Sequence, residues 1–422
     1  MTFYWDQDLA AADYFCGAGA FGYGVEQAGA RLNLAINHDP RSIATHKENF
    51  PHAKHLCMRM EEVDFAQEPD SLLGTGSPEC CYHSPSAGEK LNDQSQLPGS
   101  WTDWDEKPHV KQSRMSMWQV YRAAEAKVRK GSPYHSMVFE NVAEVASKWR
   151  DYHDWKHQMQ ALTTLGKMAG YEFQALYLNA MFFGVCQRRD RWFGVLWPKR
   201  AKRPDLAFRP QAICRSCERE IRAVQSWKNP TRQWGKYDYT GKTGQYVYRC
   251  PRCARQVYPF YRPAASVVDV TDRGVRIRDR KQYGLPPLEE KTMQRIQEGI
   301  DRFFKQPQTI PMEAVDVPQI DGLAPFWVSY YSNGKPYSIY EPFCTFSTKE
   351  RCGVVFPSDS GSLDIQECSF RMLNEQEVRG GSGLPPEYKI KADTKEELVR
   401  QCGHMVPPPM GTWVAGRVIA AM

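Results

Sequence analysis

Short apolar runs alternate with amphipathic stretches over residues 10–200. The apolar runs lie at 11–15, 32–37, 71–76, 136–142, 171–180 and 192–197. Between them, stretches such as 21–29, 40–50, 115–130 and 155–170 place apolar residues at helical spacing. This alternation predicts β-α-β units and a mostly parallel sheet, which is the α/β class.

The pattern changes between about residue 200 and residue 285. Arg, Lys, Tyr, Gln and paired cysteines replace the apolar periodicity there, which indicates a separate inserted unit. Beyond it, 287–306 predicts one amphipathic helix, and 326–347 has the alternation and the Asn-Gly turn typical of strands. A helical pattern returns after Asp364 and runs to Met422.

Composition excludes a mainly disordered chain and an integral membrane protein. The 422 residues are 41% hydrophobic and 25% charged, as in globular proteins. Mean hydropathy is −0.61, and no apolar run approaches the roughly 18 residues that a transmembrane helix needs. The N-terminus has no basic region followed by an apolar core, so we expect a cytoplasmic protein without a secretory signal.

Positive charge is concentrated in one region. The whole chain has a net charge of +6, whereas 198–287 alone holds 21 Lys and Arg against 7 Asp and Glu. The same region holds the aromatic residues Trp227, Trp234, Tyr237, Tyr239, Tyr246, Tyr248, Tyr258 and Tyr261. Cations bind phosphates and flat rings stack on bases, so this block is typical of a nucleic-acid face. A solvated basic surface explains the charge equally well.

Four of the thirteen cysteines form two Cys-x-x-Cys pairs in this block, and they are Cys214, Cys217, Cys250 and Cys253. Four thiolates at such spacing close a tetrahedral zinc site, and a small lobe with little core gains folding energy from the metal. We therefore predict a structural zinc ribbon over about 210–262, with free thiols as the alternative. Disulfides are rare in a reducing compartment.

A glycine-rich turn follows the first predicted strand. It contains Gly17, Gly19 and Gly22, and glycines at such a turn let the backbone approach a bound nucleotide closely. The pattern Gly-x-Gly-x-x-Gly also fits a tight structural turn. The next strand ends about 20 residues later and offers Asn37 and Asp39, where nucleotide-binding proteins hold a cofactor ribose.

Three further motifs lie at the ends of predicted strands. Cys80 lies in a Pro-containing turn, where a thiol is exposed enough to act as a nucleophile, although it also suits a small buried position. Glu140 stands in Phe-Glu-Asn-Val, and the run Gln187-Arg-Arg-Asp-Arg191 precedes the last strand. Taken alone, Glu140 is typical of a carboxylate at the end of a strand, and the run 187–191 is typical of a solvated group of charges.

In their order along the chain, these motifs and the segment Gly403-His-Met-Val-Pro-Pro-Pro409 resemble the motif set of the DNA (cytosine-5) methyltransferase family. The resemblance covers nearly the whole chain outside the basic insert. It implies a Rossmann-like core that uses S-adenosylmethionine, made of 1–200 and completed by 364–422. The zinc ribbon then lies within 201–363, where the family has its target-recognition domain.

The resemblance also implies roles for single residues. Cys80 corresponds to the nucleophile that adds to cytosine, Glu140 to the acid that engages the ring, and Arg189 and Arg191 to arginines of the base pocket. The family flips its target base out of the duplex, and 82–112 corresponds to a mobile loop that closes over the DNA. Cofactor contacts are expected from Phe15, Gly17, Gly19, Phe21, Asn37, His38, Arg59, Pro78, His404 and Val406.

Several of these positions depart from the family pattern. Asn37 replaces an acid that holds the ribose, and Arg59 aligns with an Asp that meets the adenine. Cys81 replaces a Gln, and His404 replaces an Asn. A roomier and more cationic pocket leads to a second hypothesis, in which the transferred group is larger than methyl or anionic. Ordinary repacking with normal methyl transfer is the first expectation.

We therefore expect methyl transfer to carbon 5 of cytosine in double-stranded DNA by a monomeric enzyme of bacterial or phage type, as in restriction-modification. A catalytically silent DNA-binding homologue is disfavoured because the expected catalytic residues are present. The transfer-RNA branch of the family usually lacks a large recognition lobe, so the insert favours DNA. An NAD-dependent oxidoreductase needs a ribose-binding acid, for which only Asp39 is available.

Overall fold

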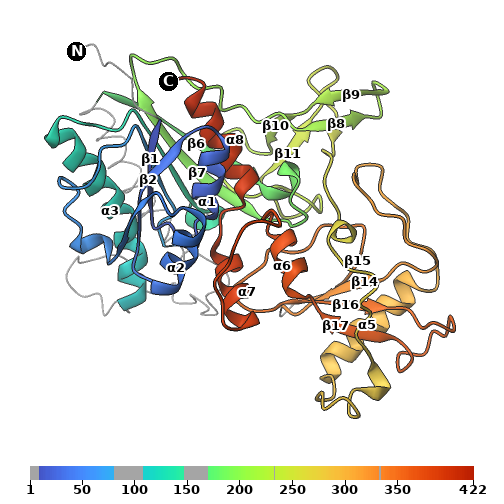
Figure 1. Ribbon diagram of the computed structural model, residues 1–422. Coiled ribbons are helices and arrows are strands. Elements are labelled where there is room, and N and C mark those ends of the chain that lie inside the picture. The colour runs from blue at the N-terminus through green and yellow to red at the C-terminus, as the bar shows by residue number, and fades with distance from the viewer. Residues whose placement is uncertain (1–8, 80–107, 147–169, 232, 332–333) are drawn as a thin grey trace, which may run out of the picture.

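The computed structural model describes residues 9–79, 108–146, 170–231, 233–331 and 334–422. Its largest unit is a seven-stranded sheet with the strand order β3-β2-β1-β4-β5-β7-β6 (Figure 1). The strands are β1 (Ala10–Tyr14), β2 (Arg31–Asn37), β3 (Lys54–Cys57), β4 (Leu73–Gly76), β5 (Ser136–Val142), β6 (Tyr171–Asn179) and β7 (Asp190–Pro198). Strands β1 to β5 pair in parallel, and β7 runs antiparallel between β5 and β6. The predicted α/β class is confirmed.

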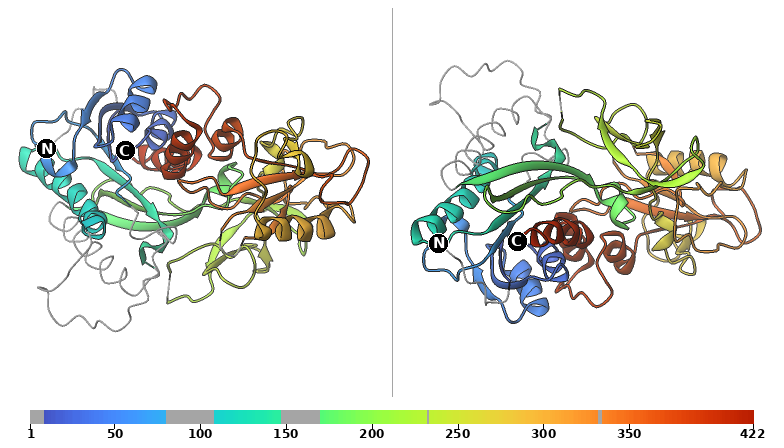
Figure 2. Two further views of the ribbon diagram at one scale, coloured as in Figure 1. Left: turned by 90° about the horizontal axis from the view of Figure 1, so that it is seen from below. Right: turned by 90° about the horizontal axis from the view of Figure 1, so that it is seen from above.

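Helices cover both faces of this sheet (Figure 2). One face carries α1 (Ala20–Gln27), α2 (Pro40–Asn49) and α8 (Pro408–Ile419), and the other carries α3 (Pro108–Lys130). Side chains alternate along β1, so Ala11 joins the core that contains Val25 and Val414. Its neighbour Ala12 joins the opposite core, which contains Val120 of α3. The last helix of the chain thereby packs beside the first.

A second sheet has five antiparallel strands in the order β13-β17-β16-β14-β15. These are β13 (Val275–Arg276), β14 (Phe326–Ser329), β15 (Pro336–Ser338), β16 (Cys352–Phe356) and β17 (Ser369–Met372), followed by α6 (Glu375–Gly381) and α7 (Lys395–His404). Helix α5 (Glu290–Phe303), predicted within 287–306, covers one face, where Ile296 and Ile300 pack with Phe326. Because β17 belongs to this sheet, the unit extends past the predicted boundary at residue 363.

The ribbon region forms two small sheets. They comprise β8 (Gln211–Cys214) with β9 (Arg219–Arg222), and β10 (Val224–Trp227) with β11 (Tyr246–Arg249) and β12 (Gln256–Val257). The ribbon packs against the short helix η4 (Ala180–Phe183), where the ring of Phe182 lies 4.9 Å from that of Tyr237 and 5.2 Å from that of Tyr248.

Most of the ribbon's aromatic residues do not form the exposed nucleic-acid face that their sequence context predicts. Tyr237, Tyr246 and Tyr248 are buried, so for these rings the prediction is wrong. A lobe with few aliphatic residues uses its large rings as its core and as its contact with the main sheet. Tyr258 remains 49% exposed.

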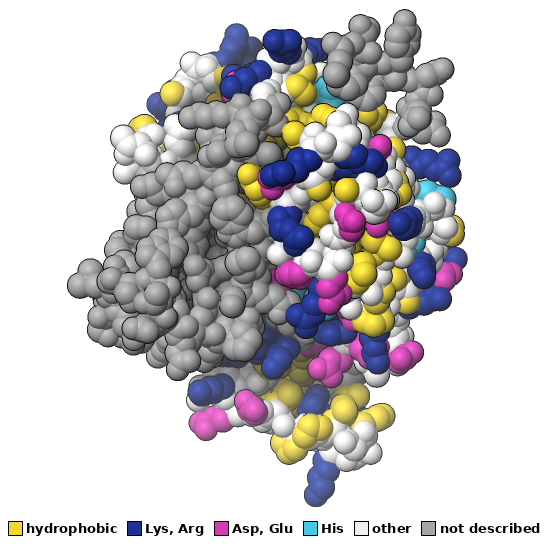
Figure 3. All heavy atoms as spheres, turned by 90° about the vertical axis from the view of Figure 1, so that its left-hand side faces the viewer, with side chains coloured by type: hydrophobic (Ala, Val, Ile, Leu, Met, Phe, Trp, Pro, Cys, Tyr) yellow, Lys and Arg dark blue, Asp and Glu magenta, His cyan; other side chains and the backbone are white. Residues whose placement is uncertain are grey.

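Charge on the main unit is mixed. On the face shown in Figure 3, Lys and Arg side chains are interspersed with Asp and Glu. This agrees with the sequence, in which the positive excess belongs to 198–287. Within the part of the chain that the structure describes, no helix combines the length and the apolar character needed to cross a bilayer.

Asp190, the first residue of β7, lies where the ribbon meets the main sheet. Its Oδ1 accepts a hydrogen bond of 3.0 Å from the backbone N–H of Tyr237. Burial raises the pKa of Asp190 to about 6, while this N–H and the ammonium group of Lys236 oppose the shift. A carboxyl group with a raised pKa binds its proton more tightly in the folded state than in the unfolded state. The folded state therefore gains stability as the pH falls through about 6.

The substitution Asp190→Asn removes this titration. Because an amide imitates the neutral carboxyl group, we expect the variant to melt above the unsubstituted protein at about pH 8, and the difference to shrink toward zero near about pH 4. Differential scanning calorimetry across this range measures the difference. Glu172→Gln, at an exposed position of β6, controls for the loss of one negative charge. A difference that does not change with pH would contradict this account of Asp190.

Candidate active site

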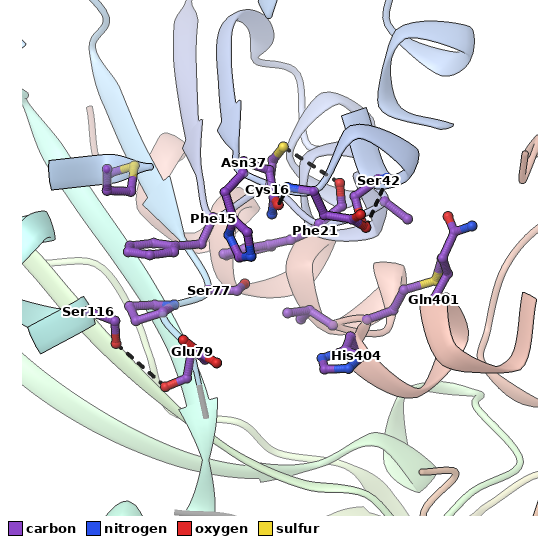
Figure 4. Close-up of a pocket in the computed structure, with 18 of the residues that line it drawn as sticks. Phe15, Cys16, Phe21, Asn37, Ser42, Ser77, Glu79, Ser116, Gln401 and His404 are labelled. Atoms are coloured by element: carbon purple, nitrogen blue, oxygen red, sulfur yellow. Dashed lines mark hydrogen bonds between the residues drawn. The ribbon is translucent and has the colours of Figure 1, made fainter. Parts of the chain in front are cut away.

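A pocket of about 400 Å³ opens at the carboxyl ends of β1, β2 and β4, the edge at which sheets of this kind bind ligands. Nine of the ten predicted cofactor residues line it, namely Phe15, Gly17, Phe21, Asn37, His38, Arg59, Pro78, His404 and Val406. Figure 4 shows Phe15 and Asn37 on one side of the pocket and His404 on the other. The pocket therefore joins residues from the two ends of the chain.

The glycines of the first turn serve two different purposes. Gly17 has a φ of +52°, and a Cβ there would meet nothing within 4 Å, so it gives the pocket a wall of bare backbone. Gly19 does not line the pocket. Its φ is +86°, and a Cβ would lie 2.8 Å from His46 and 2.9 Å from Phe50. Gly19 is therefore corrected from a cofactor contact to a residue that permits close packing at the start of α1.

The acid after β2 is engaged as a helix cap. Asp39 accepts hydrogen bonds from the backbone N–H of Ser42, at 3.2 Å, and from its hydroxyl group, at 2.6 Å. Burial alone raises the pKa of Asp39, but these bonds outweigh burial and the net shift is downward. The side-chain oxygen of Asn37 accepts from the backbone N–H of Asp39 at 2.9 Å. Asp39, the acid that an NAD site would need for the ribose, therefore caps the N-terminus of α2.

Glu140 on β5 forms a buried ion pair with Arg191 on the neighbouring strand β7. Arg191 Nε lies 2.6 Å from Glu140 Oε1, and Glu140 also lines the pocket. Burial raises the pKa of Glu140, and the guanidinium groups of Arg191 and Arg189 oppose that shift. A carboxyl group in such surroundings is suited to hold a proton at the pocket wall and to donate it.

The turn after β4 is hydrogen-bonded to the strand that carries Glu140. Asn141, next to Glu140, donates from Nδ2 to the carbonyl oxygen of Pro78 at 3.3 Å. Pro78 and Glu79 line the pocket, and the hydroxyl group of Ser116 donates to the carbonyl oxygen of Glu79 at 3.5 Å (Figure 4). The next residues, Cys80 and Cys81, lie outside the described residues, as does 82–107 of the predicted closing loop.

Arg189 is 1% exposed and joins three segments of the chain. Its Nη1 donates to the carbonyl oxygen of Phe346 at 2.9 Å, and its Nη2 donates to those of Gly403, at 2.7 Å, and Met405, at 2.8 Å. The prediction that Arg189 contacts the base is therefore corrected, because both terminal nitrogens bind backbone carbonyls. Arg189 is a positioning residue that holds the segment around His404.

His404 ends α7 and faces the pocket (Figure 4). The residue is exposed, but desolvation at the pocket wall and the guanidinium groups of Arg189, Arg400 and Arg191 lower its pKa, while Asp39 opposes the shift. The charges that act on its ring are thus three guanidinium groups and one carboxylate. Arg400, which also lines the pocket, was missed by the sequence analysis. It precedes His404 by one helical turn, and that spacing is the signal by which it could have been found.

The four ribbon cysteines, Cys214, Cys217, Cys250 and Cys253, have sulfur atoms that all lie within 4.8 Å of one another. Cys214 Sγ lies 3.5 Å from Cys253 Sγ, and Cys217 Sγ lies 3.9 Å from Cys250 Sγ. A tetrahedral zinc ion with Zn–S bonds of about 2.3 Å separates its sulfur ligands by about 3.8 Å. The donor atoms and their spacing fit zinc.

Comparison with known proteins identifies the family. A family model described as C-5 cytosine-specific DNA methylase matches residues 114–420. No curated protein matches the chain. Among solved structures, the S. pombe Dnmt2 methyltransferase is 11% identical with a TM-score of 0.52, over 98% of this chain and 99% of that one. A Spodoptera frugiperda DNMT2 mutant is 12% identical with a TM-score of 0.51, over 97% and 99% of the two chains.

At such low identity, the solved structures show a shared methyltransferase fold and nothing more specific. The family match is stronger evidence, since it spans well over half of the chain and includes both Glu140 and Arg191. It runs through the ribbon and the second sheet to the last helix. The chain belongs to the C-5 cytosine-specific DNA methylase family.

Proposed function

We propose that this DNA methylase transfers a methyl group from S-adenosylmethionine to carbon 5 of a cytosine flipped out of double-stranded DNA, with Cys80 as nucleophile. The observation that carries the proposal is the buried pair of Glu140 and Arg191 in the pocket wall. Asn141 ties this pair to Pro78, two residues before Cys80. The acid Glu140, the cation Arg191 that orients it and the turn that precedes Cys80 are therefore linked at one pocket.

The proposed reaction uses these groups in sequence. Carbon 5 of cytosine is a weak nucleophile until the thiolate of Cys80 adds to carbon 6. Glu140 donates a proton or a hydrogen bond to ring nitrogen 3, which eases the addition. The raised pKa of Glu140 favours its protonated form, and Arg191 fixes its orientation. After transfer, the proton leaves carbon 5 and the bond to Cys80 breaks, which restores the ring double bond.

S-adenosylmethionine, when bound, supplies an electrophilic methyl group. The pocket residues fit such a cofactor, since Gly17 leaves room beside the backbone and Phe21 offers a ring to the adenine. Asn37 presents its amide group where the family pattern has an acid. Because its oxygen already accepts from the backbone N–H of Asp39, its NH₂ group is the one that would bind a ribose hydroxyl.

We assign DNA recognition to the ribbon and the second sheet. The ribbon keeps Arg222, Lys242 and Arg252 exposed, while rings such as Tyr246 and Tyr248 are buried. We therefore expect the ribbon to contact DNA mainly through ionic interactions with phosphates. Such contacts add to the affinity for DNA more than to the recognition of a particular sequence. A zinc ion on the four cysteines holds this lobe together. We expect one chain to act as a monomer on the duplex.

A second candidate product is a cytosine with a larger or anionic substituent. The three guanidinium groups that act on His404, against the single carboxylate of Asp39, favour an anion at that end of the pocket. Because its pKa is lowered, His404 meets such a group as a hydrogen-bond donor, and the positive charge comes from the arginines.

Covalent trapping tests the proposed nucleophile. DNA that carries 5-fluorocytosine at the target should form a covalent adduct, because fluorine at carbon 5 blocks the release step. Cys80→Ser should abolish the adduct, and the matched control Cys81→Ser should retain it. Glu140→Gln should slow trapping by about 10²–10⁴-fold, the usual contribution of a general acid. Denaturing electrophoresis detects the adduct, and retention in Cys80→Ser with loss in Cys81→Ser would overturn the assignment.

Removal of zinc tests the ribbon. Because the metal supplies folding free energy to a lobe with little core, chelation should unfold the ribbon and weaken DNA binding by about tenfold or more. Cofactor binding should change little, since the pocket shares no residue with the cysteine cluster. Cys250→Ser should reproduce the loss, and Cys57→Ser, at an exposed cysteine outside the cluster, should not. Elemental analysis that finds far less than one zinc per chain would count against the site.

The mass of the modified nucleoside separates the two candidate products. We expect 5-methylcytosine in DNA from cells that express the enzyme, because the pocket fits the common cofactor. Liquid chromatography with mass spectrometry measures it directly. A heavier 5-substituted cytosine that disappears in His404→Asn would establish the second candidate, and 5-methylcytosine alone would reject it.

A further inference from the structure

Two cysteines outside both the pocket and the metal cluster lie side by side. Cys344 follows β15, and Cys352 is the first residue of β16. Their sulfur atoms are 3.4 Å apart. A disulfide bond requires about 2.05 Å, so the sulfurs need to approach by only about 1.4 Å to become linked.

The two thiols differ in exposure and in acidity. Cys352 is buried at 3% exposure, whereas Cys344 is partly exposed. The hydrogen bond from Cys352 lowers the pKa of Cys344, and the guanidinium group of Arg188 adds to that effect. Burial raises the pKa of Cys352. A partly exposed thiol with a lowered pKa beside a buried thiol is the arrangement found at redox-sensing cysteine pairs.

The segment between the two cysteines contacts residues 187–189, which directly precede β7. The backbone N–H of Phe346 donates to Gln187 Oε1 at 3.0 Å, and its carbonyl oxygen accepts from Arg189. The hydroxyl group of Thr345 donates to the carbonyl oxygen of Arg188 at 2.5 Å. A change in the spacing of the two cysteines is therefore transmitted directly to residues 187–189.

Arg188 links this segment to the ribbon as well. Its guanidinium carbon lies 4.4 Å from the ring centre of Tyr239 in the ribbon and 4.9 Å from that of Tyr337 on β15. Conversion of Cys344 to a disulfide removes the ionisable thiol that interacts with Arg188. The cysteine pair thus lies where the ribbon, the second sheet and β7 meet.

We propose that Cys344 and Cys352 form a reversible disulfide in response to hydrogen peroxide or another hydroperoxide. We further propose that this bond changes the position of residues 187–189. The Cys344 thiolate attacks one peroxide oxygen, the O–O bond breaks, and hydroxide leaves and takes up a proton to become water. The resulting sulfenic acid is attacked by Cys352, so that an S–S bond forms, the S–O bond breaks and a second water leaves. The two sulfurs lose two electrons in all, and the peroxide gains them. A thiol reductant reverses the reaction.

Peptide mapping of the zinc-loaded full chain tests the proposal, and its result does not depend on which base the enzyme modifies. After brief treatment with hydrogen peroxide and alkylation, mass spectrometry should find a peptide pair linked through Cys344 and Cys352. The link should disappear on reduction and be absent in both Cys344→Ser and Cys344→Ala. It should persist in Cys368→Ser, at a buried cysteine that directly precedes β17 of the same sheet.

Hydrogen exchange supplies the second readout. In the linked protein, peptides that cover 187–191 and 343–352 should change their exchange rates at least about twofold, whereas peptides of α1 and α2 should not. Two results would overturn the proposal. One is that Cys344 and Cys352 both remain open to alkylation at a peroxide concentration that oxidises the exposed Cys57. The other is that the link forms while exchange in 187–191 stays unchanged.

Discussion

The buried guanidinium group of Arg189 is the contact on which the site depends. A charge removed from water is stable only when hydrogen-bond partners replace that water. Here the partners are the carbonyl oxygens of Phe346, Gly403 and Met405, which come from two distant parts of the chain. Two of them flank His404 in the pocket wall. The side chain of Arg189, which directly precedes β7, therefore holds both the C-terminal wall of the pocket and the connection between β15 and β16 next to this strand.

The ribbon has few aliphatic residues and is stabilised by other contacts. It is rich in cations and poor in aliphatic residues, so it cannot build a large core. Four of its cysteines are spaced as a metal site requires, and the buried rings of Tyr237 and Tyr248 pack on Phe182 of η4, which follows β6 of the main sheet. Asp190 and the backbone of Tyr237 add one polar contact across the same joint. Basic side chains such as Arg222, Lys242 and Arg252 are exposed, which suits a lobe that meets phosphates.

Local patterns allow much of this architecture to be predicted from the sequence. The α/β alternation, the helix α5 and the cysteine pairs all have signals within a few residues, and the end of β2 places Asn37 at the pocket edge. The roles of Gly19 and Arg189 could not be predicted in this way. Gly19 is required because distant rings pack on it, and Met405 follows Arg189 by 216 residues. The burial of Tyr248 likewise depends on a partner, Phe182, from another unit.

Sequencing of cellular DNA with base-resolution detection of modified cytosine tests the central claim most directly. The account predicts that DNA from cells expressing the enzyme carries carbon-5 modification at cytosines within one short sequence context. Expression of Glu140→Gln should leave those cytosines largely unmodified, because the acid that activates the ring is lost. Unmodified DNA in expressing cells, together with newly modified cytosine in transfer RNA, would contradict the account.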